Sequence, residues 1–338
     1  MPVPDLAPRS LGRTGLTVTR IGVGLAAIGR PGYITLGRAQ DLPGDRSPDA
    51  LYGRAAEVLD AAIAAGVRYA DVARSYGRAE EFLARWLRER AVGRDALVVG
   101  SKWGYRYTAD WRIDAAVHEQ KELSVERFTT QLGETRALLG DRLDLYQIHS
   151  ATAESGVLVD GRLLAALADG RRRGAYRAVG LTLSGATSAR ALGTALAARV
   201  DGERVFDVVQ ATFNCLEPSL APLLLAARGE GMGIIAKEVF ANGRLTDANT
   251  RPDDAALLDS LRASAANCHA TLDQVAMAFV LAHPFVDVAL SGAATAAQLT
   301  SHVAATAVTL DPPDFHRLRA LAEPPQRYWA TRATLPWS

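Results

Sequence analysis

Short apolar runs alternate with longer amphipathic stretches along almost the whole chain after residue 20. The strand-like runs are 21–25, 68–71, 97–101, 143–148, 177–181, 207–211, 233–236 and 287–290. The helical stretches are 48–65, 79–90, 125–139, 163–173, 189–198, 220–227, 255–266, 272–281 and 296–305. Eight strand–helix repeats in 338 residues favour an α/β fold, a closed (β/α)8 TIM barrel, over an open sheet. No linker rich in Pro, Gly and Ser divides the pattern, so we expect one barrel domain over residues 1–338.

Two segments lie outside the repeat. Residues 10–18 have the pattern of a β-hairpin with a glycine-containing turn, which predicts a cap on one end of the barrel. A helix is expected over 313–322, and a proline-bearing tail with Tyr328, Trp329 and Trp337 follows it. These rings either pack on the barrel wall or line a pocket, and we favour packing because most aromatic area is used in burial.

Three connections after strand ends are long: 28–47, 103–123 and 150–162. They follow the first, third and fourth strands, which places them on the C-terminal face of a barrel. Long loops in compact domains usually carry function. The second loop contains residues suited to an apolar or sugar-like molecule, and we predict three of them as substrate contacts: Tyr105, Tyr107 and Trp111.

Asp71, Tyr76, Lys102 and His149 each lie at or just beyond the end of a strand-like run. A (β/α)8 barrel builds its active site from such positions. Singly, each residue has an ordinary structural explanation, such as a core histidine or a surface lysine with a buried stem. Together, Asp71 supplies the counter-charge that a buried Lys102 needs. The cation is expected to lower the phenol pKa of Tyr76 from about 10, which predicts a general acid, with His149 binding the substrate oxygen.

Two other motifs do not support a site. Residues 22–27 match G-x-G-x-x-A, a dinucleotide-binding pattern, but that motif requires a helix to begin at once. Gly29, Pro31 and Gly32 follow instead, so we reject it. The stretch 118–122 has one His and lacks the second His of a zinc motif, so we predict no metal site.

The net charge, the cysteine spacing and the lack of a long apolar run limit the kinds of binding partner that we expect for this chain. The net charge of +1 gives no electrostatic reason to expect nucleic acid or an anionic membrane. Cys215 and Cys268 have no metal or redox spacing. The chain start lacks the apolar centre of a signal peptide, and no run of about eighteen apolar residues occurs. We therefore expect a cytoplasmic protein, a monomer or a homo-oligomer, that binds a small molecule.

The chain resembles the aldo-keto reductases over about residues 10–305. The resemblance rests on the hairpin Leu-Gly-Arg-Thr-Gly-Leu-Thr-Val, on Asp-x4-Tyr-Gly, on Ser-Lys-x-Gly and on Leu-Asp-Leu-Tyr-Gln-Ile-His. It implies a (β/α)8 barrel that binds NADP or NAD extended across its C-terminal face. It also implies that Tyr76 donates the proton, that Lys102 and Asp71 tune it, and that His149 orients the carbonyl.

Further cofactor positions follow from the resemblance. Gln210 and Thr182 correspond to the residues that bind the nicotinamide amide, and Leu183 stands where many members have Asn. Thr182 and Leu183 resemble the L-galactose dehydrogenase-like branch more than the mammalian aldose reductases. Lys237 replaces a residue that often faces nicotinamide, and either pairs with Glu238 or contacts the cofactor pyrophosphate.

The remaining cofactor positions belong to two loops. The phosphate-side loop supplies Gly243 and Arg244, and the adenosine end supplies Ser291, Gly292, Ala293, Gln298 and His302. Cations that would bind a 2′-phosphate are missing from the adenosine end, where Ala294 is a further small residue. We therefore predict a lean towards NADH, unless an arginine from another loop, such as Arg244, replaces them.

The resulting hypothesis is an NAD(P)-dependent oxidoreductase that transfers a hydride between nicotinamide and a carbonyl or alcohol. The substrate is an aldehyde, a ketone, or an aldose or lactol. A second hypothesis is a weakly catalytic subunit that senses NAD(P)H within a larger complex. The fold alone does not separate the two, but the presence of all four strand-end residues favours the enzyme.

Overall fold

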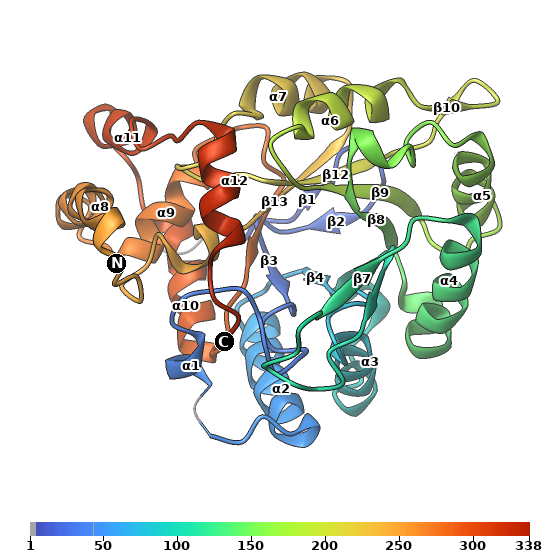
Figure 1. Cartoon of the computed structure of the whole chain (residues 1–338), viewed down its shortest axis with the longest axis horizontal. Helices are drawn as coiled ribbons and strands as arrows, with labels where there is room; N and C mark the ends of the chain where they lie inside the picture. Colours follow the sequence, from blue (N-terminus) through green and yellow to red (C-terminus); the bar gives the residue numbers. More distant parts are fainter. Residues whose placement is uncertain (1–4, 43) are drawn as a thin grey trace.

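The protein is a (β/α)8 barrel, as the alternating pattern predicts. The computed structural model describes residues 5–42 and 44–338, and within these ranges eight parallel strands close a barrel in the order β12-β13-β14-β3-β4-β5-β8-β9. Figure 1 shows the helices arranged around the outside of these strands. Each strand is followed along the chain by helical structure, so the strands all run in one direction and their C-terminal ends meet on one face.

The structure divides into barrel strands, short outer strands and helices. The barrel strands are β3 (Ile21–Gly24), β4 (Tyr69–Asp71), β5 (Val98–Trp103), β8 (Leu145–Ala151), β9 (Ala178–Leu183), β12 (Val208–Thr212), β13 (Gly233–Lys237) and β14 (Val288–Ser291). The outer strands are β1 (Arg9–Ser10), β2 (Thr17–Val18), β6 (Tyr105–Tyr107), β7 (Glu119–Lys121), β10 (Arg199–Val200) and β11 (Glu203–Arg204). The α-helices are α1 (Arg38–Asp41), α2 (Pro48–Ala64), α3 (Ala79–Glu89), α4 (Val125–Leu139), α5 (Gly161–Arg172), α6 (Ser188–Ala197), α7 (Ala221–Gly229), α8 (Ala255–Asn267), α9 (Leu272–Leu281), α10 (Ala296–Ala304), α11 (Pro312–Arg319) and α12 (Pro325–Ala333). Short 3-10 helices are η1 (Arg94–Ala96), η2 (Gly140–Arg142), η3 (Ala153–Ser155), η4 (Ala241–Gly243), η5 (Pro252–Asp254) and η6 (Ala305–Ala307).

Local sequence explains why these elements form. Barrel strands are buried on both sides, and every residue of β5 and of β9 is buried, which is why parallel strands appear as continuous apolar runs. Several helices begin at side-chain caps: the Ser47 hydroxyl accepts from the Ala50 N–H at 3.3 Å, and the Ser124 hydroxyl from the Arg127 N–H at 3.0 Å. The long segments therefore lie close to their predicted bounds.

The predicted hairpin is formed by β1 and β2, which pair antiparallel with Ser10 opposite Thr17. Its apolar residues Leu11, Leu16 and Val18 are buried in one cluster with interior residues of the barrel strands. The hairpin also bonds to the chain just before β13, where the Arg13 N–H donates to the Gly231 carbonyl at 3.0 Å. The hairpin fills the N-terminal end of the barrel, so a ligand can enter from the opposite face.

The chain's tail crosses the C-terminal face. The helix expected over 313–322 is α11, whereas α12 lies in the segment for which we expected a proline-bearing aromatic tail. Pro325 is instead the first residue of α12, where a missing N–H costs nothing and the fixed φ is favourable. Beyond α12, Trp337 forms a β-bridge with Ile34, so the tail joins the first long loop (Figure 1). Among the described residues, no helix is both long enough and apolar enough to cross a membrane.

Candidate active site

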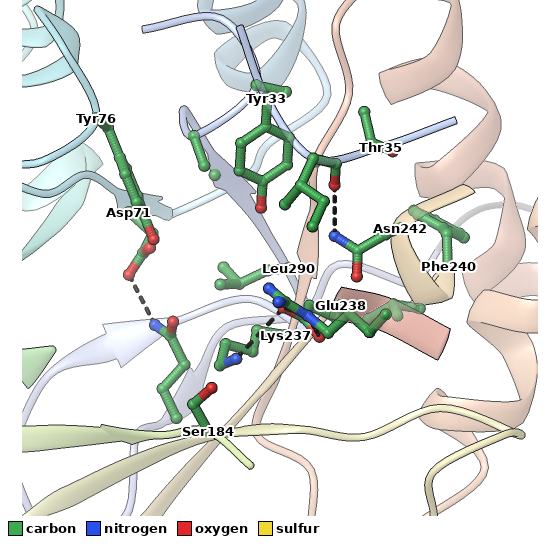
Figure 2. A pocket seen from close by; sticks show the side chains of 18 of the residues that line it. Tyr33, Thr35, Asp71, Tyr76, Ser184, Lys237, Glu238, Phe240, Asn242 and Leu290 are labelled. Carbon is green, nitrogen blue, oxygen red and sulfur yellow. Dashed lines mark hydrogen bonds and ion pairs between the residues drawn. The ribbon is translucent and has the colours of Figure 1, made fainter. Parts of the chain in front are cut away.

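One cavity of about 290 Å³ opens where the strand ends meet. Residues from several of these ends line it, and Figure 2 shows Asp71, Tyr76, Lys237 and Leu290 around it. Its wall also includes loop residues and the tail. The full lining is Gly24, Ala26, Ala27, Arg30, Tyr33, Ile34, Thr35, Asp71, Tyr76, Tyr105, Glu119, His149, Ser150, Ser184, Gln210, Lys237, Glu238, Val239, Phe240, Asn242, Gly243, Leu290, Ser291, Gly292, Arg332 and Trp337.

Asp71 and Lys102 form a buried ion pair at the ends of β4 and β5. The ammonium of Lys102 also donates to the Val72 carbonyl at 3.0 Å. The second oxygen of Asp71 accepts from the Gln210 amide at 2.8 Å and from the Tyr69 hydroxyl at 3.1 Å. Because both charges are desolvated, these extra hydrogen bonds are what make the buried pair tolerable.

A tight turn after β4 places Tyr76 beside this pair. Gly77 has φ +61°, and a Cβ there would lie 2.5 Å from the Gly29 carbonyl, so only glycine fits. The Lys102 ammonium lies 4.6 Å from the centre of the Tyr76 ring. The Tyr76 hydroxyl lies 3.5 Å from Nε2 of His149. The structure thus brings the four predicted strand-end residues together: Asp71, Tyr76 and His149 line the cavity, and Lys102 is buried behind them.

Lys102 was expected to lower the pKa of the Tyr76 phenol, but in this structure that pKa is raised. Burial raises the pKa of Tyr76 well above its ordinary value of 10, and the carboxylates of Asp71 and Glu119 raise it further, while Arg30 opposes them. Lys102 is already paired with the Asp71 carboxylate, which offsets the positive charge of its ammonium. This pairing explains why the nearby cation does not lower the pKa of Tyr76. Tyr76 is therefore a protonated donor at neutral pH.

His149 is neutral. Burial lowers its pKa well below 6.5, and the nearby cations, first Lys102 and then Lys237, lower it further. The Ser75 hydroxyl lies 3.4 Å from Nδ1 of the same ring. The edge of the ring also meets Tyr105, with ring centres 4.9 Å apart. A neutral imidazole fixed in this way has one ring nitrogen available for a ligand in the cavity.

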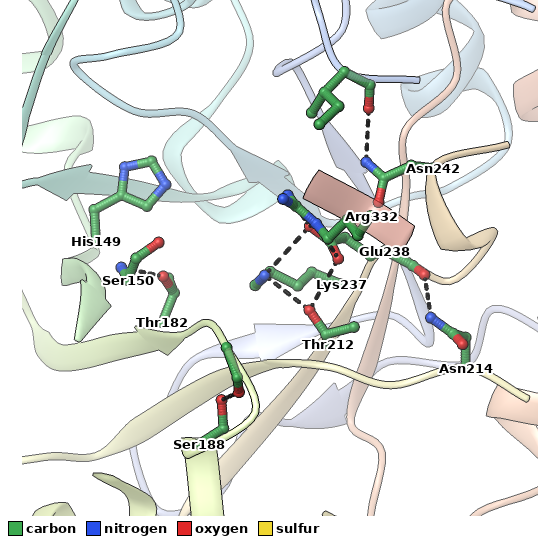
Figure 3. Close-up of polar contacts among 12 residues, drawn as sticks. His149, Ser150, Thr182, Ser188, Thr212, Asn214, Lys237, Glu238, Asn242 and Arg332 are labelled. Atoms are coloured by element: carbon green, nitrogen blue, oxygen red, sulfur yellow. Dashed lines mark hydrogen bonds and ion pairs between the residues drawn. The ribbon is translucent and has the colours of Figure 1, made fainter. Parts of the chain in front are cut away.

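Lys237, Glu238 and Arg332 form a charged cluster on the cavity wall (Figure 3). Arg332 of α12 binds Glu238 through Nε at 2.9 Å and Nη2 at 2.6 Å, and Lys237 donates to the Thr212 hydroxyl at 2.9 Å. Burial alone would raise the pKa of Glu238, but Arg332 and Lys237 outweigh it and lower the pKa to about 2. The cluster carries two positive charges and one negative charge, so one positive charge is left over for an anion.

The predicted cofactor residues fall into two groups. Gln210, Lys237, Gly243, Ser291 and Gly292 line the cavity. The others lie outside its lining and support it: Thr182 accepts from the Ser150 N–H at 2.7 Å, Ala293 donates to the Ser291 hydroxyl at 3.3 Å, Gln298 accepts from the Ala294 N–H at 2.8 Å, and His302 lies 2.7 Å from the Ser291 hydroxyl.

Arg244 does not have the position that a phosphate contact from another loop requires. Its side chain is 3% exposed. Its guanidinium binds Asp254 at 2.7 and 3.0 Å and Glu323 at 2.8 and 3.1 Å. Two carboxylates therefore pair with its guanidinium, and Arg244 lies outside the cavity lining, so its contact with the cofactor stays a prediction. Its position next to Gly243 in sequence gave no sign of these partners.

Of the predicted substrate residues, Tyr105 lines the cavity, but Tyr107 and Trp111 line a separate hollow on the surface. The indole of Trp111 donates to the Arg46 carbonyl at 2.8 Å. A strand advances about 3.3 Å per residue, so Tyr107 is carried outward along β6 while Tyr105 remains at the barrel mouth. Tyr107 and Trp111 therefore lie apart from the cavity that holds Tyr76, and their contact with substrate stays a prediction.

Other cavity residues were not predicted from the sequence. Arg30, Tyr33 and Glu119 come from long loops, and Arg332 comes from the tail. The aromatic tail gave a partial signal: Trp337 lines the cavity, whereas Tyr328 is buried against Asn214 at 3.2 Å. The preference for simple packing is thus wrong for Trp337.

The sequence and the fold are both similar to those of known proteins. A model of the aldo/keto reductase family matches residues 42–323. Aldo-keto reductase str7 of Strobilurus tenacellus is 25% identical over 345 residues, which cover 96% of this chain and 93% of that protein. The holo form of the aldo-keto reductase AKR11C1 from Bacillus halodurans has the same fold, with a TM-score of 0.72, 19% identity, and coverage of 95% of this chain and 97% of that one. The Pseudomonas aeruginosa protein PA4992 is similar in fold, with a TM-score of 0.65, 24% identity, and coverage of 90% and 95%.

Proposed function

The chain belongs to the aldo/keto reductase family, in which NAD(P)-dependent oxidoreduction is the shared chemistry, and from this we propose that Tyr76 is its general acid/base. In the reductive direction an aldehyde, ketone or aldose becomes the corresponding alcohol, and in the oxidative direction an alcohol becomes a carbonyl compound or a sugar lactol becomes its lactone. The observation that carries the proposal is the meeting of Tyr76, His149 and the Asp71–Lys102 pair at one cavity.

The residues of the cavity have separate roles in this proposal. In reduction, the Tyr76 hydroxyl donates its proton to the carbonyl oxygen as negative charge develops there. The Ser75 hydroxyl lies 3.4 Å from Nδ1 of His149, and we assign it as the donor there, which places the ring proton on Nε2, beside the Tyr76 hydroxyl. That N–H donates to the same oxygen and holds it in place. The Lys102 ammonium, 4.6 Å from the ring centre, stabilises the phenolate that remains.

The donor set of the cavity fits a nicotinamide dinucleotide. The surplus positive charge of the Lys237–Glu238–Arg332 cluster suits a phosphate, and the Gln210 amide suits a carboxamide. The side-chain oxygen of Asn242 is buried and has no hydrogen-bond partner within residues 5–42 and 44–338, so it can accept from a ribose hydroxyl or an adenine amine. When bound, the cofactor supplies or accepts the hydride.

The two directions of the reaction should depend differently on pH. Since the pKa of Tyr76 is raised above 10, the phenol is protonated throughout the range in which the protein is assayed. Since the pKa of His149 lies well below 6.5, the imidazole stays neutral over the same range. We expect kcat for reduction to be flat between about pH 7 and 9, whereas oxidation, which needs the rare phenolate, should rise about tenfold per pH unit. Flat profiles in both directions would contradict Tyr76 as the titrating group.

Cofactor preference is expected to lean towards NADH. Residues 291–302 contain no Lys or Arg, and Asp254 and Glu323 hold Arg244. A contact between a cation and the 2′-phosphate is worth about 1.5–3 kcal/mol, so its absence removes roughly a ten- to hundredfold advantage of NADPH. We expect kcat/KM with NADH to equal or exceed that with NADPH, and Gln298→Arg to shift the ratio towards NADPH. A strong wild-type preference for NADPH would contradict the assignment.

The first test of the proposal is a fluorescence titration with NADH and NADPH, followed by assays on aldehydes, ketones and aldoses. Saturable binding with turnover supports the enzyme. Saturable binding without turnover on any carbonyl, together with a stable complex with another protein, would favour the cofactor-sensing subunit. Because Thr182 and Leu183 resemble the L-galactose dehydrogenase-like branch, oxidation of a lactol is the reverse reaction to assay first.

A further inference from the structure

A second polar pair lies beside Tyr76 on the cavity wall. Arg30 comes from the first long loop and Glu119 from β7, and their side chains join at 2.8 Å between Nη1 and Oε1. The same Nη1 donates to the Ser75 carbonyl at 3.0 Å, one residue before Tyr76. Arg30 is 2% exposed, although it lines the cavity. The pair therefore connects the β6–β7 hairpin to the turn that carries the proposed proton donor.

Aromatic rings hold the guanidinium of Arg30 in one place. Its carbon lies 5.2 Å from the ring centre of Tyr33, 5.4 Å from that of Tyr76 and 5.1 Å from that of Trp337. His118 stacks on the Trp337 ring with the centres 3.9 Å apart. A side chain enclosed in this way loses little entropy when a ligand binds, so its donors are preorganised.

The pair retains hydrogen-bonding capacity. Across the described part of the chain, Arg30 donates through Nη1 alone and Glu119 accepts through Oε1 alone. The Nε of Arg30 is buried without a partner among those residues. Nη2 of Arg30 and Oε2 of Glu119 therefore remain for a ligand. The Tyr33 hydroxyl points into the same cavity (Figure 2).

Charge decides what kind of ligand fits. The Arg30–Glu119 pair is neutral as a unit, so it offers no surplus charge to an anion. The pair differs in this respect from the Lys237–Glu238–Arg332 cluster, which has a surplus positive charge. A hydroxyl group both donates and accepts, so one hydroxyl can accept from Arg30 and donate to Glu119 together.

We propose that the substrate is a neutral carbonyl compound with hydroxyl groups next to the reacting carbon, of the hydroxyaldehyde or aldose type. Arg30 and Glu119 determine this specificity by binding a hydroxyl beside the carbonyl that Tyr76 protonates. This inference rests on the proposed function, because it assumes that the reacting carbonyl lies at Tyr76. It also gives Glu119 a role that is distinct from the structural contact with Arg30.

Three four-carbon aldehydes test the inference directly: threose, butanal and succinic semialdehyde. We expect the wild type to show the highest kcat/KM with threose. Since a hydrogen bond to a charged group is at stake, Glu119→Gln should lower the threose-to-butanal ratio of kcat/KM by about 10- to 100-fold, mainly through KM for threose. Glu122→Gln is the matched control, because Glu122 pairs with Arg127 outside the cavity lining and should leave the ratio unchanged. An unchanged ratio in Glu119→Gln, or a wild-type preference for butanal or succinic semialdehyde, overturns the inference.

A binding measurement separates this inference from the proposed function. Threitol has the hydroxyl groups of threose but no carbonyl, and saturation-transfer NMR reports its binding without turnover. We expect a signal with the wild type and with Glu122→Gln, and a loss of signal with Glu119→Gln. If no aldehyde is reduced but threitol behaves in this way, the proposed reaction fails and the hydroxyl site stands. If butanal is reduced but threitol does not bind, or binds both proteins equally, the reaction stands and the hydroxyl site fails.

Discussion

Replacing Tyr76 by Phe is expected to lower kcat for carbonyl reduction by about 10²- to 10⁴-fold, the usual contribution of a positioned general acid. The Tyr76 hydroxyl lies 3.5 Å from Nε2 of His149, and the raised pKa keeps its proton in place at neutral pH. Phenylalanine retains the ring and removes only the proton that the reaction needs. Stopped-flow or steady-state reduction with NADH measures the loss.

Cofactor binding separates a catalytic defect from a structural one in this variant. The cluster of Lys237, Glu238 and Arg332 is not altered by the substitution, so the Kd for NADH should stay close to the wild-type value. Tyr105→Phe is the matched control, because it removes a hydroxyl from another tyrosine that lines the same cavity and should cost far less activity. Near-wild-type kcat in Tyr76→Phe would mean that another group donates the proton.

The barrel could be predicted from the sequence because its determinants are local. Parallel strands buried on both faces appear as short apolar runs, as in β5 and β9, and amphipathic helices appear between them. The strand-end positions of Asp71, Lys102 and His149 followed from the same pattern, because a barrel brings all C-terminal strand ends to one face. Local periodicity was therefore sufficient for the scaffold and for the centre of the candidate site.

The loops and the tail could not be predicted in this way. Arg30 and Glu119 lie 89 positions apart, and their pairing depends on how two long loops fold over the barrel mouth. Arg244 has the charge for a phosphate contact, but Asp254, ten residues further along the chain, and Glu323, from a distant segment, pair with that charge. The sign of the pKa shift of Tyr76 was wrong for a related reason. Sequence shows which charges are present, but not how deeply a phenol is buried or which partner already neutralises a lysine.

Replacing Lys102 by Met should both destabilise the protein and inactivate it. The variant leaves the Asp71 carboxylate buried without its cation, and the loss of one partner of a buried ion pair costs about 3–5 kcal/mol of unfolding free energy. The hydrogen bonds from Gln210 and Tyr69 to Asp71 remain and keep the loss within that range. Urea unfolding followed by circular dichroism measures the change.

The double variant Lys102→Met/Asp71→Asn distinguishes the structural role of the pair from its catalytic role. It removes both charges, so the free energy of unfolding should recover much of what Lys102→Met alone loses, because no uncompensated charge is buried. Reduction should not recover, since the ammonium 4.6 Å from the Tyr76 ring centre is still missing and the phenolate is no longer stabilised. Recovery of both stability and kcat would show that the pair only supports the fold. Recovery of stability alone assigns the positive charge of Lys102 to the proton transfer at Tyr76.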